Sequence, residues 1–461
     1  MGKKRASFLS PEWAFSLFDS LIENQAFSRI LLVSSIAGLA ISLSVDWGSF
    51  AAVMDNFKIA DLYKISLFVS GISPYSSEIW LAPYPPFYFI AWAPPYLLFS
   101  NLLHLSKDQI YFAFRVLLTM LSALCGVLIY KQLVFQGFSK EKSISLYSVF
   151  ILCSLTGLIQ VTGDFLGLAF LAIGCLFLLK KNTIVALVFV SVSVAFKLQP
   201  IFGLVVLLFS LTFFNWKNNK RRKIFEQTAS VAAVGAVFGI IPIFLIPGAF
   251  SSFVLYDASR LQYYTFSVYS GLYDVLFNTL PSAWSGSILH AVDIAWIIAS
   301  VSAVVLLFRV LWREKLLGYA DPIDLMSLGI MVWLIVLKQT IPYYFLWALL
   351  PLLIKGRTRS VALLMAGEFF GTLFFGLGYL FPIPTPNVGI PDLDSSVCFL
   401  IGGTLFAFFL IFSLNELLKE MRKQKRDAYL AGTETLLPIR LAKGARAHDL
   451  LFSVRELDQV L

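Results

Sequence analysis

The chain has 461 residues, of which 58% are hydrophobic and 14% are charged, with 44 Phe and 18 Tyr. Soluble domains are about 45–50% apolar and about 25% charged, so this composition excludes a soluble globular protein and indicates a polytopic membrane protein. A net charge of +9 could suggest a nucleic-acid partner, but cations that collect on one side of a membrane need no such partner.

Apolar runs recur along most of the chain, and a hydrocarbon core takes about 20 helical residues to cross. Twelve runs qualify, several of them short: 29–46, 109–132, 144–162, 164–180, 183–197, 199–215, 224–246, 287–309, 324–341, 343–355, 360–381 and 396–415. The sequence therefore predicts an all-α integral membrane protein with about twelve transmembrane helices. The first run is expected to be a retained span rather than a signal peptide, because no small-residue cleavage site follows it.

The segment from Pro85 to Leu103 is apolar but carries two proline pairs, Pro85–Pro86 and Pro94–Pro95. Proline removes helical hydrogen bonds, so the segment favours a Pro-broken juxtamembrane helix over a further span. We place it in a long first outer loop, 47–108.

Charge supports this topology independently. If 85–103 does not cross the membrane, 29 of the 36 Lys and Arg residues fall on one side. The positive-inside tendency makes that side cytoplasmic, with both termini on it. The chain then divides into a cytoplasmic N-terminus (1–28), a polytopic transmembrane domain (29–415) and a basic cytoplasmic tail (416–461), which attracts anionic lipid.

Ionisable side chains on the opposite side are few. Asp55 and Asp61 follow the first span, where a carboxylate is either a solvated loop residue or a catalytic base. The outer cations include Arg115, Lys197, Arg260 and Lys338. Such cations either snorkel to lipid headgroups or, where several face one cavity, bind phosphate.

Other kinds of site have little support in the sequence. Cys125, Cys153, Cys175 and Cys398 form no C-x-x-C pair and are predicted to fill the apolar interior, and the three His residues lack metal-ligand spacing. No glycine-rich phosphate loop is present, so a nucleotide-sugar or ATP is not the expected substrate, and no cofactor is predicted.

Three stretches carry a resemblance to a known family. SGISPYSSEIWLAPYPPFYF (70–89) resembles the G-x-x-P-Y, then Y-x-P signature of class C glycosyltransferases, which are polytopic enzymes that use polyprenyl-phosphate sugars. GDFLGLAFLAIGCLFLLKKN (163–182), followed by VSVAFKLQPIFGLVVLL (192–208), looks like the family's two short helices with an A-x-K-x-x-P junction at Lys197 and Pro200. KQTIPYYFLWALLPLLI (338–354) resembles the Y-F-L-W, then L-L-P segment of the first mannosyltransferase of GPI-anchor synthesis.

The resemblance implies which residues act. In this family an Asp of the first outer loop is the catalytic base, and the first GPI mannosyltransferase has two acids six residues apart there, which Asp55 and Asp61 reproduce. We favour Asp55 as the base, with Asp61 as the alternative. Position 53 is Val, so no D-x-D motif supports a divalent metal. Such a metal stays an alternative, and no metal-binding residues are predicted.

The implied function is an inverting hexose transfer, similar to that of polyprenyl-phosphate-mannose-dependent mannosyltransferases, within 29–415. The donor is a polyprenyl-phosphate sugar, and the acceptor is lipid-linked or a glycan on the extracytoplasmic side. Lys197, Arg260 and Lys338, with Arg115 as the weakest candidate, would bind the donor phosphate. Tyr75, Tyr84, Tyr343 and Tyr344 would line the donor and acceptor sites, although aromatic residues also gather at any membrane interface.

Two other classes remain open. A secondary transporter or a lipid or glycolipid flippase would have the same kind of spans, and a non-catalytic scaffold would explain the spans but not the order of the motifs. The expected location is the plasma membrane, with the endoplasmic-reticulum membrane as the alternative. The sequence identifies no partner subunit.

Overall fold

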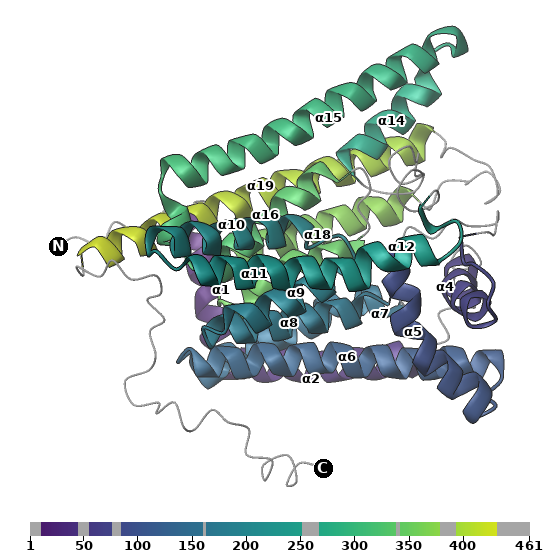
Figure 1. Cartoon of the computed structure of the whole chain (residues 1–461), viewed down its shortest axis with the longest axis horizontal. Coiled ribbons are helices and arrows are strands. Elements are labelled where there is room, and N and C mark those ends of the chain that lie inside the picture. The colour runs from purple at the N-terminus through teal and green to yellow at the C-terminus, as the bar shows by residue number, and fades with distance from the viewer. Residues whose placement is uncertain are drawn as a thin grey trace.

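The computed structural model describes residues 11–44, 55–75, 84–159, 163–250, 267–337, 342–378 and 393–430 (Figure 1). All regular elements within these ranges are helices, as the all-α prediction requires. They are α1 (Pro11–Glu23), α2 (Gln25–Ser44), α4 (Asp55–Val69), α5 (Pro86–Leu97), η1 (Leu98–Leu102), α6 (Lys107–Phe135), α7 (Lys140–Ile159), α8 (Asp164–Leu179), α9 (Thr183–Phe196), α10 (Ile201–Lys217), α11 (Arg221–Val234), η2 (Gly235–Ile240), α12 (Ile241–Leu245), α14 (Val268–Thr279), α15 (Ser282–Arg313), η4 (Leu316–Gly318), α16 (Pro322–Val336), η5 (Pro342–Phe345), α17 (Leu346–Ile354), α18 (Thr358–Gly378) and α19 (Leu393–Leu430).

Several helices have the length and apolar character that a membrane requires. Within the described residues, five segments are long and apolar enough to cross it: Gln25–Ser44, Lys107–Phe135, Arg221–Leu245, Gly286–Arg313 and Leu393–Asp427. The prediction of an all-α membrane protein is therefore confirmed in its coarse form. Each of the twelve predicted spans overlaps a helix, but the number of crossings stays a prediction.

The shorter apolar helices form the interior of the bundle. Almost every residue of α16 and α17 is buried, and most residues of α8 are too. Helices that are apolar on all faces are stable only where other helices surround them, which explains their central position. The long helix α15 lies instead at an edge of the bundle (Figure 1) and exposes Ile294, Ile297, Val301 and Val305 along one stripe, as expected of a lipid-facing helix.

Most of the helices that lie along the bundle alternate in direction, so their connections collect at two ends (Figure 1). We call one of them the basic end: there α6 joins α7, α8 joins α9, α10 joins α11, α15 joins α16 and α17 joins α18, and polar contacts link these connections. Helix α1 and the last turns of α19 lie at the basic end too, since Lys142 pairs with Glu23 and Arg422 pairs with Glu314. We call the opposite end, where α9 joins α10, the site end.

Helix α5 differs from the expected Pro-broken helix. It continues through Pro94 and Pro95, and its irregular part comes after them, as the π-helical turn η1. The two prolines cannot donate hydrogen bonds, and one wider turn after them keeps the chain helical. Helix α5 lies across the site end rather than along the bundle (Figure 1). Its residues Phe87, Tyr88 and Phe89 are buried.

Candidate functional site at the junction of α8, α9 and α17

Lys197 ends α9 at the site end. It is the C-cap residue, with an extended backbone (φ −153, ψ 137), and Pro200 is the N-cap of α10 three residues later. Proline at that position prevents α9 from continuing, and a helix C-terminus favours a cation. The Lys197 side chain is nevertheless only 3% exposed, so its charge needs a partner inside the protein.

Asp164 provides that partner. It is the first residue of α8, where the helix dipole favours an anion. Its Oδ1 lies 2.7 Å from the Nζ of Lys197, and its Oδ2 accepts a hydrogen bond of 3.3 Å from the indole Nε1 of Trp347 on α17. Each charge therefore sits at the helix end that stabilises it, and α8, α9 and α17 meet at the pair.

Three tyrosine rings surround the ammonium group of Lys197. The Nζ atom lies 4.6 Å from the ring centroid of Tyr84, 4.8 Å from that of Tyr344 and 5.5 Å from that of Tyr343. Tyr343 and Tyr344 belong to the turn η5, just before α17, and Tyr84 precedes α5. At these distances the ring faces stabilise the cation. We call Lys197, Asp164, Tyr84, Tyr343 and Tyr344 the lysine cage.

The predicted motif around Tyr75 lies next to the lysine cage. Gly71 ends α4 with a positive φ of 78°, and Ile72 N–H donates to the carbonyl oxygen of Leu67, a geometry that glycine adopts without strain. Tyr75, four residues later, is buried and donates from its hydroxyl to the carbonyl oxygen of Tyr84 at 2.8 Å. Gly71 to Tyr75 thus fix the backbone of a tyrosine that covers Lys197.

The other predicted site residues fall into three groups. Arg115 is buried on α6, with its guanidinium carbon 5.8 Å from the ring centroid of Tyr111, and the cage contacts given above do not include it. Arg260 and Lys338 lie outside the described residues. Asp55 and Asp61 lie in α4, but their side chains are outside the described part, and helical positions six apart are about 240° apart around the axis.

Asp164 and Trp347 are the site residues that the sequence analysis did not identify. Both stand inside stretches that carry the family resemblance, and Asp164 is the only carboxylate between 163 and 182. A single acid at the start of an apolar helix, at the same end as Lys197, was the available signal. Within the described residues, no three His, Cys, Asp or Glu side chains come together as a metal site.

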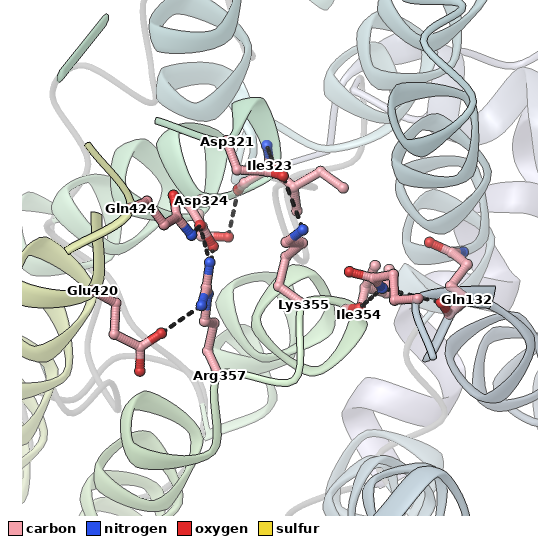
Figure 2. Close-up of polar contacts among 11 residues, drawn as sticks. Gln132, Asp321, Ile323, Asp324, Ile354, Lys355, Arg357, Glu420 and Gln424 are labelled. Carbon is pink, nitrogen blue, oxygen red and sulfur yellow. Dashed lines mark hydrogen bonds and ion pairs between the residues drawn. The ribbon is translucent and has the colours of Figure 1, made fainter. Parts of the chain in front are cut away.

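A second polar cluster lies at the basic end (Figure 2). Arg357, just before α18, donates from Nε to Oδ1 of Asp324 at 2.9 Å, and its second guanidinium nitrogen contacts the other carboxylate oxygen. It also pairs with Glu420 on α19 at 2.6 Å, and Gln424 donates to Asp324 at 3.0 Å. Lys355 pairs with Asp321 at 2.8 Å. These contacts tie the start of α16 to α18 and α19.

Comparison with models of known protein families and with curated proteins finds no match for this chain. The case for a function therefore depends on the residues and their geometry.

Proposed function

We propose that this chain is a membrane glycosyltransferase that transfers a hexose, with mannose as the first candidate, from a polyprenyl-phosphate sugar to a lipid-linked or glycan acceptor. The observation that carries the proposal is the lysine cage. Tyr84, Lys197, and Tyr343 with Tyr344 come from the three stretches that carry the family resemblance, and they meet around one buried cation.

The chemistry of the cage suits a phosphate leaving group. In the transfer, the acceptor oxygen attacks the anomeric carbon, the bond from that carbon to the phosphate oxygen breaks, and the electron pair passes to the phosphate. A cation held in place before the reaction stabilises this developing charge. Asp164 and the tyrosine faces hold Lys197 in one position, so little reorganisation is needed in the transition state.

Tyrosine faces also suit the rest of the donor, since they offer apolar and weakly electronegative surfaces to a sugar or to isoprene units. The proton of the acceptor hydroxyl passes to a carboxylate, for which we propose Asp55, with Asp61 as the alternative. Both residues lie on α4, which packs against α5 beside Tyr84. The proposed orientation has both termini in the cytoplasm and the site end outside, in the plasma membrane.

Transfer of radiolabelled mannose and glucose from their polyprenyl-phosphate esters to a lipid extract tests the proposal. We expect transfer by the purified wild type and a loss of at least about 100-fold in one of two variants, Asp55→Asn or Asp61→Asn, because general-base catalysis contributes about 10²–10⁴-fold. The unaffected variant is the matched control. Absence of transfer from every polyprenyl donor by folded protein would refute the proposal.

One observation favours a second candidate, a transporter or a lipid flippase. Glu368 is buried near the middle of α18, where its Oε1 accepts a hydrogen bond of 2.8 Å from Thr372 and its Oε2 has no hydrogen-bond partner among the described residues. A carboxylate within a span is costly and often marks an ion or substrate pathway. If this candidate is right, Glu368→Gln abolishes lipid or solute flux in proteoliposomes while Asp55→Asn leaves it unchanged; sugar transfer that is unaffected by Glu368→Gln supports the transferase.

A further inference from the structure

The turn between α10 and α11, at the basic end, carries a dense group of cations. Five of the seven residues from 217 to 223 are Lys or Arg: Lys217, Lys220, Arg221, Arg222 and Lys223. We call these five residues the corner patch. Glu226 is the only carboxylate between 201 and 240, so the sequence around the patch is strongly basic.

The protein compensates little of this charge. Among the residues that the structure describes, the one ion pair of the corner patch joins Arg222 to Glu226 at 2.8 Å, and the Arg222 side chain is 92% exposed. Other cations at the basic end pair with carboxylates from neighbouring elements. These pairs are Lys355–Asp321, Arg357–Asp324, Arg359–Glu416 and Arg422–Glu314. Uncompensated positive charge is therefore concentrated at the α10–α11 turn.

Local helix stability does not explain the corner patch. Lys220 is the N-cap of α11 and its side chain makes no capping hydrogen bond, and Arg221, Arg222 and Lys223 form the first turn. The positive end of a helix dipole disfavours cations, so these residues weaken the start of α11 unless an anion offsets them.

Buried hydrogen bonds fix the backbone that carries the patch. Asn215 on α10 donates from its amide to Gln227 on α11 at 2.9 Å, and Gln227 donates to the hydroxyl of Thr183 on α9 at 2.8 Å. The backbone N–H of Lys220 donates to the carbonyl oxygen of Asn215 at 2.8 Å. The turn is thus held in one shape, and binding of a ligand to its surface requires little ordering of the backbone.

Exposed aromatic side chains lie beside the cations. Trp216 is 66% exposed, with the guanidinium carbon of Arg221 5.8 Å from its ring centroid, and Phe225 is 75% exposed. Trp312, near the end of α15, is exposed as well and packs against Phe213 with ring centroids 5.4 Å apart. Aromatic residues gather where a membrane meets water, so these rings place the corner patch at the level of the lipid head groups.

We infer that the corner patch binds the phosphate head groups of anionic lipids. Each Lys or Arg near the membrane surface adds to the attraction for such lipids, and the planar guanidinium groups of Arg221 and Arg222 match phosphate oxygens with paired N–H donors. Trp216 and Phe225 would pack against the lipid just beyond the head group. In the proposed orientation the lipids belong to the cytoplasmic leaflet, and their binding does not depend on the proposed glycosyltransferase activity.

Native mass spectrometry of the full chain in detergent, titrated with phosphatidylglycerol or with zwitterionic phosphatidylcholine, tests the inference. We expect the wild type to bind phosphatidylglycerol more tightly. Lys220→Gln/Arg221→Gln/Lys223→Gln, which keeps the Arg222–Glu226 pair, should weaken binding of phosphatidylglycerol at least about tenfold and leave binding of phosphatidylcholine unchanged. All three side chains are exposed, so this variant should unfold at the wild-type temperature.

Lys131→Gln/Lys180→Gln/Lys181→Gln is the matched control. It removes the same charge from exposed positions at the basic end, but these positions lie outside the corner patch. Its affinity for phosphatidylglycerol should equal that of the wild type. Equal weakening in both triple variants would show that net charge alone attracts the lipid and would overturn the inference. Unchanged affinity in the corner-patch variant, or a wild type that binds both lipids equally, would overturn it too.

Discussion

Two lysine–aspartate pairs of nearly equal length, one buried and one largely buried, lie at opposite ends of the bundle. Lys197 and Asp164 are 2.7 Å apart at the site end, and Lys355 and Asp321 are 2.8 Å apart at the basic end. Their surroundings differ. Aromatic rings enclose Lys197, whereas Lys355 lies two residues from Arg357, among further ion pairs and amides (Figure 2).

The different surroundings of Lys197 and Lys355 suit the two ends of the bundle to different roles. At the basic end, the planar fork of Arg357 meets Asp324 through two nitrogens and reaches Glu420 as well, which fixes three helices with directional bonds. At the site end, one hydrogen bond to Asp164 positions the ammonium of Lys197, and ring faces rather than further ion pairs surround it. The first arrangement suits a structural clamp, and the second suits a group that interacts with a changing substrate.

The largest effect on both stability and sugar transfer is expected from substitutions of Lys197 and Asp164. Lys197→Met leaves Asp164 buried without its cation and should lower the free energy of unfolding by about 3–5 kcal/mol. The double variant Lys197→Met/Asp164→Asn should recover most of that stability, since no lone charge remains. Its sugar transfer should stay at least about 100-fold below the wild type, because the cation is missing from the transition state. Thermal unfolding in detergent and the transfer assay measure the two quantities.

The matched control is Lys355→Met/Asp321→Asn at the basic end. Asn at 321 keeps an oxygen for the hydrogen bond from Ile323 N–H, so the cap of α16 is preserved. This double variant should unfold with nearly the free energy of the wild type and should transfer sugar at the wild-type rate. If the site-end double variant also transferred sugar at the wild-type rate, the lysine cage would be a structural feature like its counterpart.

The sequence predicted the cage in part, because hydropathy gives the alternation of the helices. Once the spans are placed, Lys197, Tyr84 and the 343–344 pair must all lie at one end, and the structure brings them together. Asp164 was missed although the short connection between α8 and α9 places the start of α8 beside the end of α9, because the sequence analysis considered carboxylates only in the first outer loop. The Arg357 cluster was missed because its cations were interpreted only as markers of a membrane side.

A second prediction concerns Asp274, a buried carboxylate whose Oδ2 has no hydrogen-bond partner within the part of the chain that the structure describes. Asp274 lies on α14, between the predicted spans 224–246 and 287–309, and is 1% exposed. Gly271, on the same face of α14, packs against the backbone of Leu400 on α19. Burial raises the pKa of Asp274 from 3.8 to about 8. The folded state then binds a proton that the unfolded state releases between these values.

Stability should therefore fall as the pH rises from about 4 to about 8 and change little from this group above that range. The slope has an upper limit of about 1.4 kcal/mol per pH unit. Asp274→Asn should abolish this slope and make the protein more stable than the wild type at pH 8, as measured by chemical unfolding across the range. A wild-type slope that persists in Asp274→Asn would mean that burial alone does not penalise this carboxylate, and that pairing matters less at the two ends than we infer.

The smallest effect is expected at the ion pair between Arg422 and Glu314, which lies at the basic end but is partly exposed to solvent. Arg422 on α19 donates two hydrogen bonds of 2.6 Å to Glu314, and these lower the pKa of Glu314. Its geometry is as good as that of the buried pairs, yet the Arg422 side chain is 47% exposed. Water screens exposed pairs, so Arg422→Gln should lower the free energy of unfolding by less than about 1 kcal/mol, and transfer should be unchanged.

The contribution of this pair to the wild-type free energy of unfolding should also decrease as the pH falls below the usual range of Glu, since protonated Glu314 no longer attracts the cation. A loss as large as that of Lys197→Met would contradict the inference that burial is what separates the two ends.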